Sequence, residues 1–179
     1  MIQTFLLYKT YNVLKYSKLV VTIHKKGVDM KYQVGEVGRV VVARFEDGDE
    51  ILQNLIDIVK REAIKTGILY LLGGIKDARI VVGPEEDRLP PVPVWRELRE
   101  SYETFGIGTI FWRGDEPKIH FHGTYGKWDN VKTGCLRESA NTFIVMEAII
   151  VEIRGVKAIR DLDPASNMVL LKLLDSSNS

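Results

Sequence analysis

One stretch of the chain has clear helical spacing, and most other apolar residues stand in short strand-like runs. Apolar side chains recur at intervals of three and four residues from Ile51 to Ile64. Asp47, with Glu50 three residues later, resembles a capping box, so we expect a helix over about residues 47–66. A single helix among many strands predicts an α+β domain built on a mostly antiparallel sheet.

The expected strands are runs of β-branched and aromatic residues that end at turn-forming residues. These runs cover residues 37–45, 68–75, 78–82, 105–112, 118–126, 142–153 and 168–173. The stretch 84–94 holds four of the six prolines and predicts a loop, whereas the pattern of residues 95–100 does not choose between helix and strand. Gly106 and Gly108 fit kinks in a curved strand better than a phosphate-binding loop, because they complete no phosphate motif.

The size and composition of the chain fit one globular domain. With 179 residues, 45% hydrophobic and 27% charged, the chain is large enough to bury a core and unlike a disordered protein. Twenty-five basic and twenty-four acidic side chains give a formal charge of +1, which provides no general attraction to nucleic acid or anionic lipid. A single cysteine excludes an internal disulfide, and no apolar run reaches the length of a membrane span. We therefore expect a cytoplasmic protein that does not bind membranes.

The first 29 residues differ in composition from the rest of the chain. They contain five lysines and one acid, Asp29, with neither arginine nor glutamate. One interpretation is a basic arm that contacts an acidic partner. The other is that residues 1–29 are an extension outside the natural protein, which would then start at Met30 and form one domain over residues 30–179.

Two of the three histidines, His120 and His122, stand two residues apart in an expected strand. Alternate side chains of a strand share one face, so both imidazoles lie on the same side, with Cα atoms about 6.6 Å apart. The only cysteine, Cys135, follows thirteen residues later, and a turn between them can bring it beside the histidine strand. Two imidazole nitrogens and a thiolate suit Zn²⁺ with one coordination position left open.

The same residues also fit a purely structural interpretation, which the spacing leaves open. Histidines in a strand often make ordinary hydrogen bonds, and isolated cysteines commonly behave as small buried apolar residues. Glu147 has apolar neighbours in the expected strand 142–153, where a carboxylate needs a partner. That partner is either an imidazole of the metal site or a cation such as Arg44. Beside a metal, Glu147 would also be able to serve as a catalytic base.

The order of these motifs resembles the plants and prokaryotes conserved (PPC) domain family over roughly residues 35–175. The shared pieces are an arginine-containing strand, GDE before the helix, GGIKDARI, a GTI strand, GDEP, HFH, a Gly-Cys-Leu turn and a strand with an internal glutamate. The resemblance implies an α+β fold with a curved antiparallel sheet and assembly into a homotrimer.

The resemblance also implies a metal site. Several prokaryotic members carry a His-x-His strand followed by a Gly-Gly-His turn, and their three histidines can bind zinc. His120 and His122 match the first two, and Cys135 stands where the third histidine would be, in the sequence TGCL. Because a thiolate is also a good zinc ligand, the resemblance implies that these three residues are metal ligands.

The leading functional hypothesis is a small homotrimeric PPC protein that binds a divalent metal and acts as an assembly or regulatory module. One alternative is a zinc-dependent enzyme that acts on a small polar substrate, with Glu147 as its base. The other is a DNA-associated protein, because prokaryotic relatives are often labelled DNA-binding by similarity to plant proteins that carry an Arg-Gly-Arg-Pro AT-hook. Residues 113–117 read RGDEP here, so neither charge nor motif supports DNA binding. The sequence does not identify a small-molecule ligand.

Overall fold

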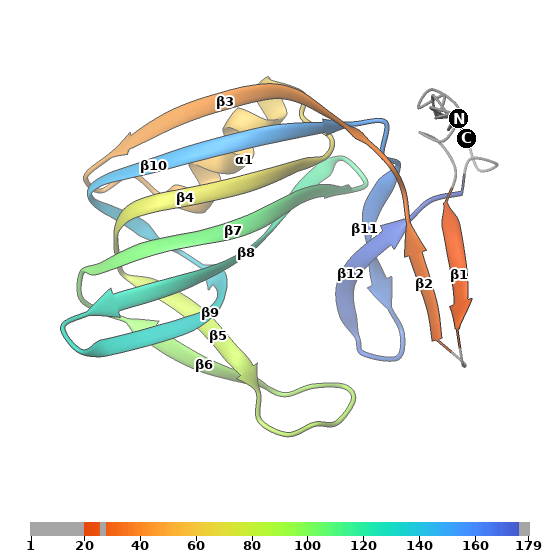
Figure 1. Cartoon of the computed structure of the whole chain (residues 1–179). Coiled ribbons are helices and arrows are strands. Elements are labelled where there is room, and N and C mark those ends of the chain that lie inside the picture. The colour runs from red at the N-terminus through yellow and green to blue at the C-terminus, as the bar shows by residue number, and fades with distance from the viewer. Residues whose placement is uncertain (1–19, 26–27, 176–179) are drawn as a thin grey trace, which may run out of the picture.

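The computed structural model describes residues 20–25 and 28–175. Its main feature is a curved ten-stranded sheet with one α-helix on it (Figure 1). The helix is α1 (Ile51–Arg61). The strands of the main sheet are β3 (Glu36–Glu46), β4 (Gly67–Lys76), β5 (Ala78–Pro84), β6 (Pro93–Leu98), β7 (Tyr102–Arg113), β8 (Glu116–Lys127), β9 (Asn130–Glu138), β10 (Asn141–Arg154), β11 (Ala158–Asp163) and β12 (Met168–Leu173). A separate two-stranded sheet pairs β1 (Val21–Lys25) with β2 (Val28–Tyr32).

Neighbouring strands run in the order β3-β10-β4-β7-β8-β9-β5-β6, and every pair along this path is antiparallel. The hairpin of β11 and β12 lies off this path, and β11 joins β7 by one parallel pairing, Ile159 with Trp112. The predicted α+β fold with a curved, mostly antiparallel sheet and one main helix is therefore confirmed. The undecided segment at residues 95–100 is largely strand β6, and strands β1, β2 and β11 were not predicted from the sequence.

Helix α1 is shorter than the expected 47–66 and has a different cap. Glu50 is the N-cap residue, and its carboxylate accepts a hydrogen bond from the backbone N–H of Gln53. Asp47 instead accepts a hydrogen bond of 2.9 Å from the backbone N–H of Ile144 in β10. The prediction that Asp47 caps the helix is therefore wrong, because its carboxylate fixes the loop before α1 to the sheet. Within the described residues, no helix has the length and apolar character needed to cross a membrane.

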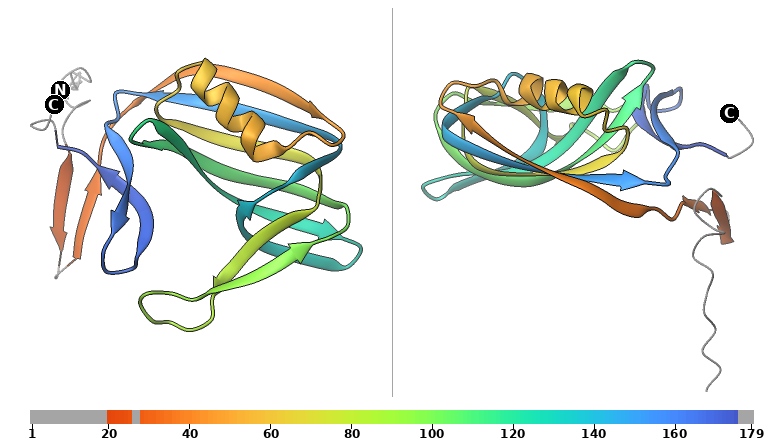
Figure 2. Two further views of the ribbon diagram at one scale, coloured as in Figure 1. Left: turned by 180° about the vertical axis from the view of Figure 1, so that it is seen from behind. Right: turned by 90° about the horizontal axis from the view of Figure 1, so that it is seen from above.

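The helix and one face of the sheet enclose the core (Figure 2). Ile51, Leu55 and Val59 of α1 are fully buried, as expected for the apolar side of an amphipathic helix. They pack in one cluster with sheet residues such as Phe121 and Met146. His120 and His122 flank Phe121 in β8. Because side chains alternate along a strand, both histidines lie on the opposite face of the sheet, which we call the open face.

The open face carries large apolar side chains that the described residues leave exposed. Strand register aligns Val42, Ile149, Tyr70 and Ile107 in one row across β3, β10, β4 and β7. Their exposed fractions range from 40% to 74%. We define the open-face patch as Val40, Val42, Tyr70, Leu72, Phe105, Ile107 and Ile149. Contiguous exposed apolar side chains of this kind make the open-face patch a candidate interaction surface.

Candidate metal centre

His120, His122 and Cys135 come together on the open face of β8 and β9. Strand register places Cys135 directly opposite His122, so the β8–β9 turn brings the cysteine beside the histidine strand. One ligand atom from each residue can be chosen so that all three lie within 4.8 Å of one another. The two imidazole Nε2 atoms are 3.0 Å apart, with the rings nearly perpendicular at 86°. The three residues that the sequence singled out thus form one cluster.

The cluster is within about 1 Å of the dimensions of a tetrahedral zinc site. With Zn–N bonds near 2.0–2.1 Å and Zn–S near 2.3 Å, neighbouring donors in a tetrahedron lie about 3.3–3.7 Å apart. The imidazole nitrogens are already close to this separation. A donor as far as 4.8 Å away needs to move by only about 1 Å, which a small side-chain rotation provides. Two nitrogens and a sulfur therefore fit the ion in both chemistry and geometry.

Burial and nearby cations set the protonation state of the cluster. Burial, together with the smaller effects of the charges of Arg160, His122 and Arg137, lowers the pKa of His120 to about 4. Its imidazole is therefore neutral at pH 7, which is the form that binds a metal. Burial also raises the pKa of the Cys135 thiol, while the two arginines act in the opposite direction. A metal must therefore displace the thiol proton when it binds.

A row of glycines on the opposite side of the sheet holds β8 in its position. Gly106, Gly123 and Gly134 are register neighbours across β7, β8 and β9. A Cβ atom added to Gly106 would lie 2.3 Å from the carbonyl oxygen of His122, and one at Gly123 would lie 2.8 Å from the Phe121 ring. The glycines thus provide space for backbone and for a buried ring directly behind the histidines. The three glycines are therefore packing residues. For Gly106 this agrees with the prediction of a glycine in a curved strand and not in a phosphate-binding loop.

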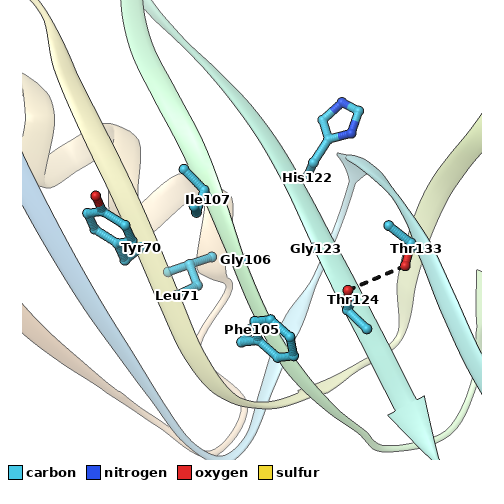
Figure 3. A pocket seen from close by; sticks show the side chains of 9 residues that line it. All are labelled: Tyr70, Leu71, Phe105, Gly106, Ile107, His122, Gly123, Thr124 and Thr133. Carbon is cyan, nitrogen blue, oxygen red and sulfur yellow. Dashed lines mark hydrogen bonds between the residues drawn. The ribbon is translucent and has the colours of Figure 1, made fainter.

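A shallow pocket of ≈ 450 Å³ opens beside His122 (Figure 3). Tyr70 and Ile107 of the open-face patch line one side. Thr124 and Thr133 line the other, with their hydroxyl oxygens 3.3 Å apart. The pocket lies between His122 and the open-face patch, so a ligand bound there would contact both an imidazole and apolar side chains.

Glu147 is not part of the cluster. It is exposed on β10, opposite Arg44 of β3 and Leu72 of β4, and strands β4 and β7 separate it from β8. The guanidinium of Arg44 pairs instead with Glu46. The expectation that Glu147 is an apolar-surrounded acid in need of a partner is therefore wrong, and the structure gives it no position beside the histidines.

Sequence reasoning missed the two arginines beside the cluster. Arg137 follows Cys135 by two residues on the same strand, so alternation alone places it on the same face. Arg160 comes from β11, which reaches β7 through a pairing between residues 47 positions apart in sequence. Alternation was a signal for Arg137, whereas the sequence contains no signal for Arg160.

Comparison with known proteins gives a family match and several solved structures of the same fold. The family model of the Plants and Prokaryotes Conserved (PCC) domain matches residues 32–154. A search of curated protein sequences finds no match.

Three solved structures illustrate the similarity of fold. A metal-containing protein from Archaeoglobus fulgidus has a TM-score of 0.70 and 22% identity, over 82% of this chain and 100% of that one. A plant- and prokaryote-conserved protein from Pyrococcus horikoshii has a TM-score of 0.69 and 26% identity, over 81% of this chain and 99% of that one. A candidate DNA-binding protein from Ralstonia eutropha has a TM-score of 0.63 and 22% identity, over 74% of this chain and 90% of that one.

Proposed function

Because the chain belongs to the Plants and Prokaryotes Conserved domain family, we propose that it is a metal-binding assembly module that holds Zn²⁺ with His120, His122 and Cys135. The observation that carries the proposal is the convergence of these three ligand atoms within 4.8 Å on the open face. The donor set of two imidazoles and a thiolate favours zinc over the hard cations Mg²⁺ and Ca²⁺, which prefer oxygen ligands. The Archaeoglobus fulgidus protein of the same fold also contains a metal.

Metal analysis of the purified protein tests the proposal. Protein prepared without chelator is expected to contain about one zinc per chain, and His122→Ala is expected to lose most of it because one of three ligands is removed. His24→Ala is the matched control, since His24 lies in β1 of the separate two-stranded sheet. Zinc-free wild-type protein after growth and dialysis with zinc would overturn the proposal.

We also propose that the functional domain covers residues 30–179, with residues 1–29 as an extension. The family match begins at residue 32, which supports a domain start near Met30. In the two-stranded sheet, residues 21–23 of the extension pair with residues 30–32, the first residues of this domain. Deletion of residues 1–29 is expected to leave zinc content unchanged; a loss of zinc would show that the extension belongs to the domain.

The open-face patch supports the second part of the proposal, assembly into a homotrimer. The patch consists of apolar side chains on a regular sheet surface, and burying them against another copy would be favourable at about 25 cal/mol per Å². The metal cluster lies at its edge, because His122 is the register neighbour of Ile107. Self-association would therefore also cover part of the pocket beside His122.

Replacing Leu72 with glutamate is expected to convert the trimer into monomers, because a charge would be buried in each apolar contact. Light scattering should give three times the chain mass for the wild type and one chain mass for Leu72→Glu. Leu89→Glu is the control, since Leu89 is similarly exposed but lies in the loop between β5 and β6. A wild-type protein that is monomeric at micromolar concentration would contradict the assembly.

DNA binding is less well supported than metal binding. The sequence that partly matches an AT-hook forms the β7–β8 hairpin, where Gly114 and Asp115 make the turn between Arg113 and Glu116. A fixed hairpin with acidic residues cannot enter a minor groove as a flexible arginine segment does. An enzymatic role would need a base other than Glu147, given the distance of β10 from β8 in the sheet.

A further inference from the structure

Arg160 of β11 is a buried cation whose contacts leave its charge without a counter-ion. Its exposed fraction is 7%, and no carboxylate of the described residues forms an ion pair with it. Its Nη2 donates a hydrogen bond of 2.8 Å to the Thr109 hydroxyl, and its guanidinium carbon lies 5.6 Å from the centre of the Phe111 ring. Its Nε is buried without a hydrogen-bond partner.

A buried guanidinium in this state destabilises the free protein. Arginine stays protonated in proteins, so the side chain cannot escape the cost of burial by losing its charge. A buried charge without a counter-ion and a buried donor without an acceptor each cost free energy. Groups that break these rules tend to belong to functional sites, where a ligand supplies the missing partner.

The position of Arg160 connects it to the candidate metal centre. Thr109, which accepts its hydrogen bond, is the register neighbour of His120. The charge of Arg160 acts on both His120 and Cys135, and the charge of Arg137 acts on the same two residues. Two guanidinium groups, one from β11 and one from β9, therefore act electrostatically on two of the three candidate ligands.

We propose that Arg160, assisted by Arg137, binds a small oxyanion beside the metal, and that the ligand carries a carboxylate or phosphate group. This inference rests on the proposed function, since the metal provides the second attachment point. A zinc ion held by two neutral imidazoles and one thiolate keeps one positive charge and one open coordination position. When bound, zinc would offer its open position to one oxygen of the ligand, and the Arg160 guanidinium, whose Nε has no hydrogen-bond partner, would hold another.

The oxyanion position comes from a part of the chain outside the family match. The match ends at residue 154, whereas Arg160 lies in the β11–β12 hairpin that follows. The three candidate ligands and Arg137 lie within the matched residues 32–154. Arg160 therefore reaches the candidate metal centre from a hairpin that follows the matched segment of the same domain.

Calorimetric titration of zinc-loaded protein with inorganic phosphate, and separately with acetate, tests the proposal. Arg160→Met is expected to lower the affinity for the tighter of the two anions at least about tenfold, with zinc content unchanged. Arg137→Gln should lower it by a smaller factor, because Arg137 is exposed. Arg88→Gln, an exposed arginine in the β5–β6 loop, should leave it unchanged.

The stability of the metal-free protein separates ligand binding from a structural role. In phosphate-free buffer, Arg160→Met is expected to unfold at the same or a higher denaturant concentration than the wild type, because it removes a buried unpaired charge. Lower stability of Arg160→Met in that buffer would identify a structural cation and overturn the proposal. Arg160→Lys provides a second variant, since it keeps the charge but loses the paired donors and should also lose affinity.

Separate measurements test the oxyanion site and the metal site. Equal anion affinity in the wild type, Arg160→Met and Arg160→Lys would overturn the oxyanion site even when zinc is bound. Absence of zinc from the wild type would overturn the metal site, and the zinc-dependent part of the oxyanion proposal with it. Zinc content and anion affinity are measured separately, so each result is assigned to one of the two.

Discussion

Replacing Cys135 with serine is expected to reduce the affinity of the protein for Zn²⁺ by more than about 100-fold. Loss of a residue that only hydrogen-bonds to a metal ligand typically reduces metal affinity by roughly 10–100-fold, and loss of a ligand itself should cost more. The substitution keeps the size of the side chain but exchanges a thiolate for a hydroxyl, which is a poor zinc ligand at neutral pH. Competition with a chelator of known affinity measures the change. Cys135 is the register neighbour of His122, and its Sγ lies within 4.8 Å of an imidazole nitrogen of each histidine, so a side-chain rotation would let it share an ion with them.

Cobalt substitution identifies the donor directly. Co²⁺ bound to a thiolate absorbs in the near ultraviolet by charge transfer from sulfur, so the wild type should show this band and Cys135→Ser should not. His24→Ala should keep it. Zinc affinity in Cys135→Ser equal to that of the wild type would show that the buried thiol is a packing residue, which is the alternative that the sequence left open.

The cluster was predictable because it depends on local rules. Strand alternation fixed His120 and His122 on one face, and a hairpin-length connection allowed Cys135 to return beside them. The same rule explains the error at Glu147. Its neighbours Met146 and Ala148 are apolar and buried, but they point to the helix face while Glu147 points to the open face. Apolar neighbours along a strand therefore do not imply an apolar environment.

The remaining features depend on contacts between distant segments. Arg160 reaches the cluster only because β11 lies beside the end of β7, and no spacing in the sequence encodes that pairing. Glu50 caps the helix, and the predicted cap Asp47 does not, because the Asp47 carboxylate accepts a hydrogen bond from the backbone of β10, about a hundred residues later in the chain. Local capping patterns compete with such long-range partners, and the sequence alone does not indicate which interaction is stronger.

The metal cluster and the open-face patch are parts of one surface. His122 continues the row of Val42, Ile149, Tyr70 and Ile107, and the pocket beside it is lined by residues of both. In the proposed assembly, association through the patch would cover the pocket and exclude water from the side of the cluster at His122. Because electrostatic attraction is stronger in a drier environment, assembly would also strengthen oxyanion binding at Arg160.

Gly106→Ala is expected to lower the free energy of unfolding by about 3 kcal/mol, at the upper end of the usual cost of overpacking a core. The added methyl group would lie 2.3 Å from the carbonyl oxygen of His122 and 2.6 Å from the Phe121 ring. The first of these contacts is with backbone, which cannot rotate away, so β7 and β8 would have to separate. Denaturant unfolding of the metal-free protein measures the loss.

Gly126→Ala is the matched control for this prediction. Gly126 lies in β8, the strand that pairs with β7, but a Cβ atom there would meet nothing within 4 Å. We expect its effect on stability to stay within about 0.5 kcal/mol, as for most surface substitutions. Because separating β7 and β8 would also shift His120 and His122, Gly106→Ala should weaken zinc binding while Gly126→Ala should not. Equal stability of the two variants would show that the glycine row does not hold the histidine strand in place.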